Sequence, residues 1–319
     1  MKRTMVKRAI ATLGGAAVAL LLLGQSSAAL AVAPVAKTVP WVASNPLIPH
    51  DIFSGELTRL KGATDMQGND IQYIWDFGDG SPVATGTVTN MYVVEAAHTY
   101  SGNVGDVFVA TLTIENTGTG ETDTAQYYLQ IRDKNLETEV NRAIDEGLWW
   151  LHKTRIDTTC NALPCSNWYF SYDGSFGGYS AVAGSTVNAI EANGHLASGN
   201  PSNPYVETVQ RGLRYLLTTL VSESISTQPA GDPDSNGNGL GVRVNGNYYP
   251  YAGGSVMDAL ITSQTPNAVA DTGGANVIGR MYKDIVQDMV DSYAYGQYDA
   301  DAARGGWRYS WNQFPDNSA

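Results

Sequence analysis

A short run at residues 73–81, Tyr-Ile-Trp-Asp-Phe-Gly-Asp-Gly-Ser, joins strand residues directly to turn residues. Tyr73, Trp75 and Phe77 occupy alternate positions, which is the period of a β-strand with one buried face. The Gly-Asp-Gly sequence at 78–80 tolerates the positive φ angles of a tight reversal. The run therefore predicts a strand that ends in a hairpin turn.

Further along the chain, a His-Thr-Tyr sequence at 98–100 precedes a β-rich run at 107–114, which the Asn-Thr-Gly-Thr-Gly sequence at 116–120 closes. Together with the run at 73–81, these motifs resemble the PKD domain, an immunoglobulin-like β-sandwich common in secreted and surface proteins. The resemblance covers residues 38–133. It implies an all-β domain and an extracellular setting, and it implies no particular activity.

Three polar residues in these motifs are candidates for a catalytic or metal-binding role. Asp76 and Asp79 could be calcium ligands or an acid/base pair, but an Asp beside Gly in a hairpin more often bonds nearby backbone amides. We interpret both as structural. We interpret His98 in the same way, because no nucleophile or partner acid can be identified for it.

The N-terminus has the pattern of a secretory signal peptide. A basic head precedes an apolar run at 9–24, and small residues follow, so we expect a signal peptide over residues 1–31 with cleavage after Ala29 or Ala31. An uncleaved anchor is the alternative, but the apolar run is shorter than the ~20 residues that span a bilayer. We expect a secreted, cell-surface or periplasmic protein without a membrane span.

The charge of the chain excludes one class of partner. With 31 acidic and 19 basic residues the formal net charge is −12, and phosphate backbones are bound mainly by Lys and Arg. We therefore expect no nucleic-acid partner.

At residues 132–135 the apolar period changes from two to about 3.6, which predicts a boundary and a helical domain over 136–319. Asn135 is a suitable N-cap, and Pro204 after Asn203 marks a second helix start. The apolar face of the first predicted helix consists of Leu136, Val140, Ile144, Leu148 and Leu151.

The second half contains an internal repeat, because residues 143–151 can be aligned with 208–216. Each copy predicts a long helix, a Gly- and aromatic-rich loop, and a shorter helix, at 185–194 in the first copy and 255–263 in the second. With the loops at 173–178 and 304–309, this pattern resembles the α/α toroid of squalene–hopene cyclases and prenyltransferase β subunits. The resemblance implies all-α helical-hairpin repeats, and hence a multidomain chain. A third copy stops early, so we expect an incomplete toroid whose open end permits self-association.

The catalytic motifs of the two toroid families are incomplete in this sequence. Asp301 falls at the proton-donor position of the cyclases' Asp-x-Asp-Asp motif, but Ala302 replaces the last acid, and the prenyltransferases' zinc ligands are absent. Glu191, His195 and Asp258 lie on or beside the shorter helices, where surface or cavity-lining roles are the simpler interpretation. We predict no catalytic residue and no organic cofactor.

The loop that contains Asp232, Asp234, Asn236 and Asn238 resembles the first half of an EF-hand calcium loop. The position of the bidentate Glu is occupied by Arg243. Calcium is therefore a possible ligand of these four residues, and a solvated loop between helices is the alternative.

The two cysteines, Cys160 and Cys165, predict a local disulfide in an oxidising compartment. A metal site is the alternative, but it would need more ligands than the nearby His152 supplies.

Aromatic side chains are frequent in the second half, and we expect most of them to pack between repeats. The remainder could bind sugars or a peptide. The residues concerned are Trp168, Tyr169, Tyr172, Tyr248, Tyr249, Tyr251, Trp307 and Trp311. Two functions follow: a non-catalytic binding or spacer protein for carbohydrate or protein ligands, or an extracellular enzyme, either polysaccharide-processing or a degenerate relative of the terpenoid cyclases.

Overall fold

The computed structural model describes residues 32–39, 49–169, 178–246, 249–300, 302 and 304–312. The described residues from Ala33 onward belong to one compact unit. The predicted signal peptide at 1–31 lies outside the described residues. No helix in the described ranges is long and apolar enough to cross a membrane.

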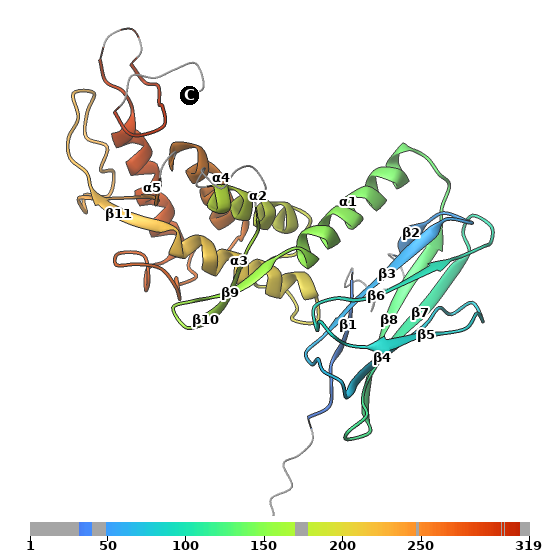
Figure 1. The fold of residues 1–319 in the computed structure, drawn as a ribbon. Coiled ribbons are helices and arrows are strands. Elements are labelled where there is room, and N and C mark those ends of the chain that lie inside the picture. The colour runs from blue at the N-terminus through green and yellow to red at the C-terminus, as the bar shows by residue number, and fades with distance from the viewer. Residues whose placement is uncertain are drawn as a thin grey trace, which may run out of the picture. The chain divides into compact units, whose positions relative to one another are not determined.

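The first part of the chain folds into two β-sheets that share one core (Figure 1). The smaller sheet is antiparallel, and its strands in order are β1 (Ala36–Thr38), β3 (Leu57–Thr64) and β6 (Val94–Thr99). The larger sheet has the order β2 (His50–Ile52), β8 (Glu121–Ile131), β7 (Val107–Asn116), β4 (Ile71–Asp76) and β5 (Ala84–Thr87). Strand β2 lies at the edge of this sheet and runs parallel to β8.

The run at 73–81 does what its pattern predicts. It lies in β4 and the turn after it, and Trp75 is fully buried in the sandwich core, edge-on to Tyr127 with ring centroids 5.9 Å apart. Just after β4, Tyr100 donates its hydroxyl hydrogen to the carbonyl of Phe77, with 3.1 Å between the oxygens. Alternation likewise buries Ala110, Leu112 and Ile114 of β7 and Tyr127, Leu129 and Ile131 of β8 in the core.

The part of the chain after residue 135 is mixed α and β, so the predicted all-α toroid is wrong. Its helices within the described residues are α1 (Leu136–Lys153), α2 (Gly178–Ala192), α3 (Pro204–Thr218), α4 (Tyr249–Thr262) and α5 (Tyr282–Gly296). A β-hairpin follows α1 and another follows α3, in segments whose sequence predicted loops. They consist of β9 (Ile156–Cys160) with β10 (Leu163–Asn167), and β11 (Leu220–Ser224) with β12 (Leu240–Val244).

The second hairpin belongs to the core of this part rather than to its surface. Val242 and Val244 of β12 are both buried and belong to the same apolar cluster as Leu213 of α3 and Ile285 of α5. The hairpin side chains therefore replace part of the helix-to-helix contact that a toroid would make.

Helices α2 and α4 begin earlier than predicted, at Gly178 and Tyr249 instead of 185 and 255. Glycines in their first two turns, Gly178 and Gly184 in α2 and Gly253 and Gly254 in α4, indicated loops, because glycine is unfavourable in helices. The small residues instead allow close packing: a Cβ at Gly184 of α2 would lie 2.7 Å from the carbonyl oxygen of Ser255 in α4. Tertiary contact thus outweighs propensity here.

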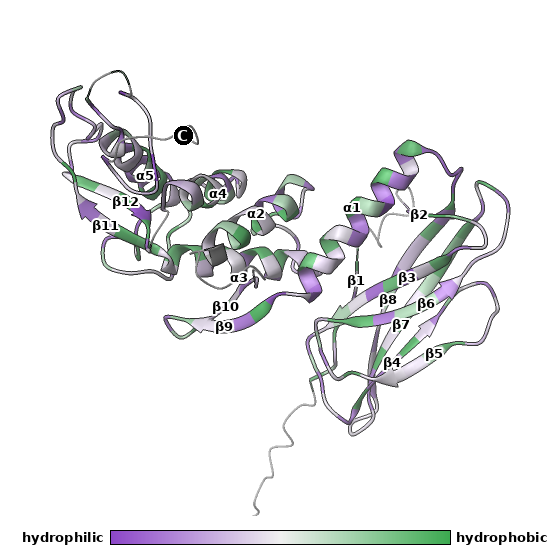
Figure 2. Cartoon of the chain, turned by 45° about the horizontal axis from the view of Figure 1, so that its top comes forward, coloured by the Kyte–Doolittle hydropathy of each residue, from purple (hydrophilic) through white to green (hydrophobic). Residues whose placement is uncertain are grey.

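Helix α1 starts as predicted, with Asn135 as its N-cap and a capping box to Thr138. Its predicted apolar face is only partly buried, which corrects the prediction: Leu136, Val140 and Ile144 are exposed, whereas Leu148 is buried. Hydrophilic and hydrophobic residues are interleaved along α1 (Figure 2). Helix α1 contacts the sandwich through charged groups, such as Asp145 with Lys61, and through polar ones, such as the Trp149 indole with Glu95.

Candidate binding site

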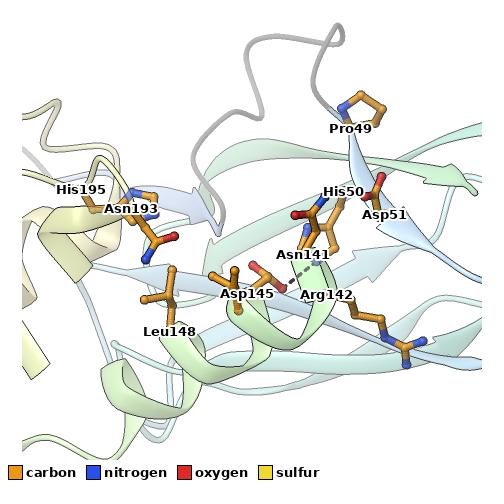
Figure 3. Close-up of a pocket in the computed structure, with 10 residues that line it drawn as sticks. Pro49, His50, Asp51, Asn141, Arg142, Asp145, Leu148, Asn193 and His195 are labelled. Atoms are coloured by element: carbon orange, nitrogen blue, oxygen red, sulfur yellow. Dashed lines mark ion pairs between the residues drawn. The ribbon is translucent and has the colours of Figure 1, made fainter. Parts of the chain in front are cut away.

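A cavity of about 300 Å³ lies where β2, α1 and the turn after α2 meet (Figure 3). The ten described residues that line it combine polar and aliphatic side chains. They are Pro49, His50, Asp51, Asn141, Arg142, Ile144, Asp145, Leu148, Asn193 and His195.

His50 and Asp145 form one wall of the cavity, and a dashed line joins them in Figure 3. Strand β2 presents His50, whose Nε2 lies 2.8 Å from Oδ2 of Asp145 on α1. The His50 ring also packs edge-on against Tyr127 of β8, with centroids 5.4 Å apart. The imidazole is thus fixed from two sides.

Behind this wall lies Lys61 of β3, whose side chain is 0% exposed. Its ammonium pairs with Asp145 and, at 2.9 Å, with Oε1 of Glu146. Burial alone raises the pKa of Asp145, but the charges and hydrogen bonds of His50 and Lys61 hold it below its ordinary value. Asp145 is therefore ionised and engaged with two basic partners.

His195 faces the cavity from the other side, next to Asn193. Asn203 uses its Oδ1 to accept from the Tyr205 amide at 3.0 Å, so its Nδ2 faces Nδ1 of His195, 2.9 Å away. Nδ1 is then the accepting nitrogen, and the hydrogen of the neutral ring is on Nε2. Burial lowers the pKa of His195, which favours this neutral form.

Two phenol hydroxyls lie close behind the cavity without a hydrogen-bond partner: those of Tyr127 and Tyr205. Both residues are fully buried, and burial raises the pKa of each well above its ordinary value. The Tyr205 ring packs against His195, with centroids 4.6 Å apart. These hydroxyls extend the hydrogen-bonding capacity of the region beyond the lining residues.

The described lining residues offer hydrogen bonding but no free acid/base pair. Asp145 is paired as above, and Oδ1 of Asp51 lies 3.7 Å from Nε of Arg132. Glycoside hydrolysis usually needs two carboxyl groups free to act as acid and as base or nucleophile. The arrangement is suited to holding a polar molecule.

The structure places the four predicted calcium residues in one loop before β12. Asp234 accepts from the amides of Gly237, Asn238 and Gly239 at 2.9, 3.2 and 2.7 Å, and Asp232 accepts from the amide of Asp234 at 3.1 Å. The carboxylate oxygens of Asp232 and Asp234 therefore stabilise turns within the loop itself.

The two asparagines of that loop direct their amide nitrogens at a buried acid on α5. Asn236 and Asn238 donate to Asp288 at 2.7 and 3.1 Å, and Arg280 pairs with the same carboxylate at 2.7 Å. In the described part of the chain, no group of three or more His, Cys, Asp or Glu side chains is arranged to hold a metal ion. Calcium binding by the loop stays a prediction.

Cys160 and Cys165 are joined by a disulfide, with Cα atoms 5.8 Å apart, at the end of the β9–β10 hairpin. The bond closes the hairpin turn at Asn161 and Ala162, both of which have positive φ. The disulfide is thus part of the local fold.

The suspected polar residues of the sandwich have structural partners. Asp76 accepts from the Gly78 amide at 2.9 Å, and Asp79 accepts from the Ser81 amide at 3.0 Å and contacts Nε2 of His98 at 2.7 Å. Burial opposes ionisation of Asp79, but the bonds from Ser81 and His98 lower its pKa to about 2. Asp76 and Asp79 thus bond backbone amides, as the structural interpretation expects, but His98 does have an acid partner in Asp79, which the sequence did not identify.

Residues of the second half singled out in the sequence have different surroundings. Trp168 is buried and its indole donates to the Leu151 carbonyl at 2.7 Å, while the Trp311 indole donates to Glu223 at 2.6 Å. Glu191 is buried, and both of its carboxylate oxygens lack a hydrogen-bond partner. Tyr172, Tyr248 and Asp301 lie outside the described residues.

Sequence reasoning missed His50, Lys61, Asp145 and Glu146. One signal was present: Lys61 follows Leu60 in a short strand, and adjacent strand residues face opposite sides of a sheet, so with Leu60 in the core the lysine had to face the other side. Nothing in the sequence showed that a helix 84 residues later would cover it.

Comparisons with known proteins add little. No protein-family model matches the chain, and a search of curated proteins finds no significant match. Among solved structures, the chain is similar to the PKD domain of an M14-like peptidase from a Thermoplasmatales archaeon. That match has 16% sequence identity, covers 32% of this chain and 94% of the other, and has a TM-score of 0.22. A likeness this weak establishes neither family nor function.

Proposed function

We propose that this chain is a non-catalytic binding protein of the extracellular space, and that the cavity between β2 and α1 holds a carbohydrate ligand. The observation that carries the proposal is the composition of the cavity wall. Asn141, Asn193 and the imidazole of His195 line one space together with Ile144 and Leu148. Asn193 donates its Nδ2 to the Ala189 carbonyl at 2.8 Å, so its Oδ1 is the atom it offers. A sugar presents hydroxyls at its rim and C–H groups on its faces, and this mixture complements both.

The charges of the site support binding rather than catalysis. The acids at the wall are held by fixed basic partners, so their charges balance within the protein. Because the charges of the wall are already paired within the protein, a neutral, hydroxyl-rich molecule can bind there without an opposing charge of its own. Export of the chain rests on the pattern of residues 1–31.

A screen of the mature protein against immobilised oligosaccharides tests the proposal, with the solution above the array analysed for released products. We expect retention on a subset of neutral oligosaccharides and no new product. The Asn141→Ala/Asn193→Ala double variant should lose this retention, and Asn103→Ala, which removes an exposed amide elsewhere, should keep it.

Other outcomes of the same screen would redirect the function. Product formation would favour the alternative, a polysaccharide-processing enzyme. Retention only on peptide controls would identify a protein ligand, and retention unaffected by the double variant would move the site away from this cavity.

A further inference from the structure

Lys61 is enclosed on every side, and its only charged partners in the described residues are two carboxylates on α1. Its side chain is 0% exposed and contacts Asp145 and Glu146, which are themselves 15% and 42% exposed. Leu60 beside it faces the sandwich core, so Lys61 faces α1 from the opposite side of the sheet. The strand and the helix thus hold an amine against a carboxyl group.

We propose that Lys61 and Asp145 become joined by an intramolecular amide bond. The ion pair already contains every atom that the reaction requires. A bond forms between Nζ of Lys61 and Cγ of Asp145, one C–O bond of the carboxyl group breaks, and water leaves. Two of the three ammonium protons go to the departing oxygen, so one cation and one anion become a neutral amide and a neutral water. Nothing is oxidised or reduced, and no co-reactant is needed.

The neighbouring groups suit the steps of this reaction. Glu146 Oε1, 2.9 Å from Nζ, can accept the first proton and return it to the leaving oxygen. His50 Nε2, 2.8 Å from Oδ2 of Asp145, can stabilise the negative charge that develops on the carboxyl oxygen under attack. Asp145 also lines the cavity, which gives the released water a way out.

Position and burial both favour the bond over the ion pair. Transfer of one proton from the Lys61 ammonium to the Asp145 carboxylate gives the neutral amine and carboxylic acid that can react, and well-oriented groups reach effective concentrations of roughly 10⁵–10⁸ M. A buried ion pair also keeps two charges out of water, whereas an amide carries none. The bond would fasten β3 to α1 covalently across 84 residues of sequence.

The intact mass of the mature protein, reduced and denatured, tests the proposal. We expect wild type to be lighter than its sequence by one water molecule. Proteolysis should give a branched peptide in which Lys61 and Asp145 are linked, which distinguishes the amide from a cyclic imide formed at a single Asp. Wild-type protein of full mass, with Lys61 free to react with an amine reagent in denaturant, would overturn the proposal.

Variants separate the roles of the residues. Asp145→Ala and Lys61→Met should show no loss of water, and Glu146→Gln should fold but leave a large unreacted fraction. Glu137→Gln, an exposed carboxylate on the same helix, should react as wild type does. If the Lys61→Met protein fails to fold, the branched peptide from wild type still decides the matter, because its absence contradicts the proposal.

Discussion

Lys61 and Asp145 lie 84 residues apart in the sequence and in contact in the structure, with the lysine side chain fully buried. The contact connects β3 of the sandwich to α1. Trp149 of the same helix donates its indole hydrogen to Glu95 of β6, with 2.5 Å between nitrogen and oxygen. The first helix is therefore attached to the sandwich through polar and charged groups, of which Asp145 also lines the cavity.

His152 makes the stability of the protein sensitive to acid. Its Nδ1 lies 2.7 Å from the Thr208 hydroxyl and its Nε2 2.9 Å from the Tyr92 carbonyl, and burial lowers its pKa to about 3. The His152 imidazole takes up a proton near pH 6.5 in the unfolded chain but only near pH 3 in the folded protein. The free energy of unfolding therefore keeps this contribution above pH 6.5 and loses it as the pH drops toward 3. Urea unfolding of wild type and His152→Gln should show the loss in wild type, about 1.4 kcal/mol per pH unit, and a smaller one in the variant. Equal slopes would contradict this account.

Glu191 makes the stability of the protein depend on pH in the opposite direction. Both of its oxygens are buried without partners, and burial raises its pKa to about 8. The folded protein therefore holds the proton of the Glu191 carboxyl group more tightly than the unfolded chain does. The stability that this proton binding adds is present below pH 4.5 and is lost as the pH rises through 8. We expect Glu191→Leu to raise the melting temperature at pH 8.5 and to change it little at pH 5. A stabilisation that does not grow with pH would argue against the raised pKa.

The sandwich could be predicted from the sequence because its signals are local. Alternation and turn residues in 73–81 specify which side chains enter the core, and a strand needs little else to be recognised. The hairpins of the second half carry weaker signals. The strands of the second hairpin are only five residues long: β11 follows α3 after a single residue, and β12 follows a Gly- and Asn-rich stretch that indicates a loop.

The candidate site could not be predicted, because it forms only when distant segments meet. His50 comes from an edge strand, Asp145 from a helix and His195 from a turn, and no linear spacing relates them. The calcium motif, in contrast, can be recognised from its spacing in the sequence. In the structure, however, the carboxylate of Asp234 accepts hydrogen bonds from backbone amides of its own loop.

Two glycines test the packing of the helices. Gly184→Ala should destabilise the fold by about 1–3 kcal/mol, because the new methyl group would meet the Ser255 carbonyl 2.7 Å away. Gly147→Ala in α1 is the matched control: nothing lies within 4 Å of its added Cβ, so it should stabilise by about 0.5–1 kcal/mol. Chemical denaturation measures both, and a neutral Gly184→Ala would mean that α2 and α4 are further apart than described here.

Calcium should affect the loop before β12 weakly, because Asp234 already accepts three backbone hydrogen bonds. We expect millimolar calcium to raise the melting temperature slightly at most, and Asp234→Ala to remove that rise. Asp271→Ala, outside the loop, and magnesium at the same concentration serve as controls. A rise that persists in Asp234→Ala would place the ion elsewhere.

A titration followed by nitrogen NMR of the side chains that line the cavity between β2 and α1 shows whether this cavity holds a hydroxyl-rich ligand. Neutral oligosaccharides retained in the array screen are the probes. We expect saturable shifts of the His195 imidazole and the Asn141 and Asn193 amides, with the His98 imidazole of the sandwich unchanged. Saturating oligosaccharide that leaves the three cavity side chains unshifted, or that shifts only His98, would contradict it.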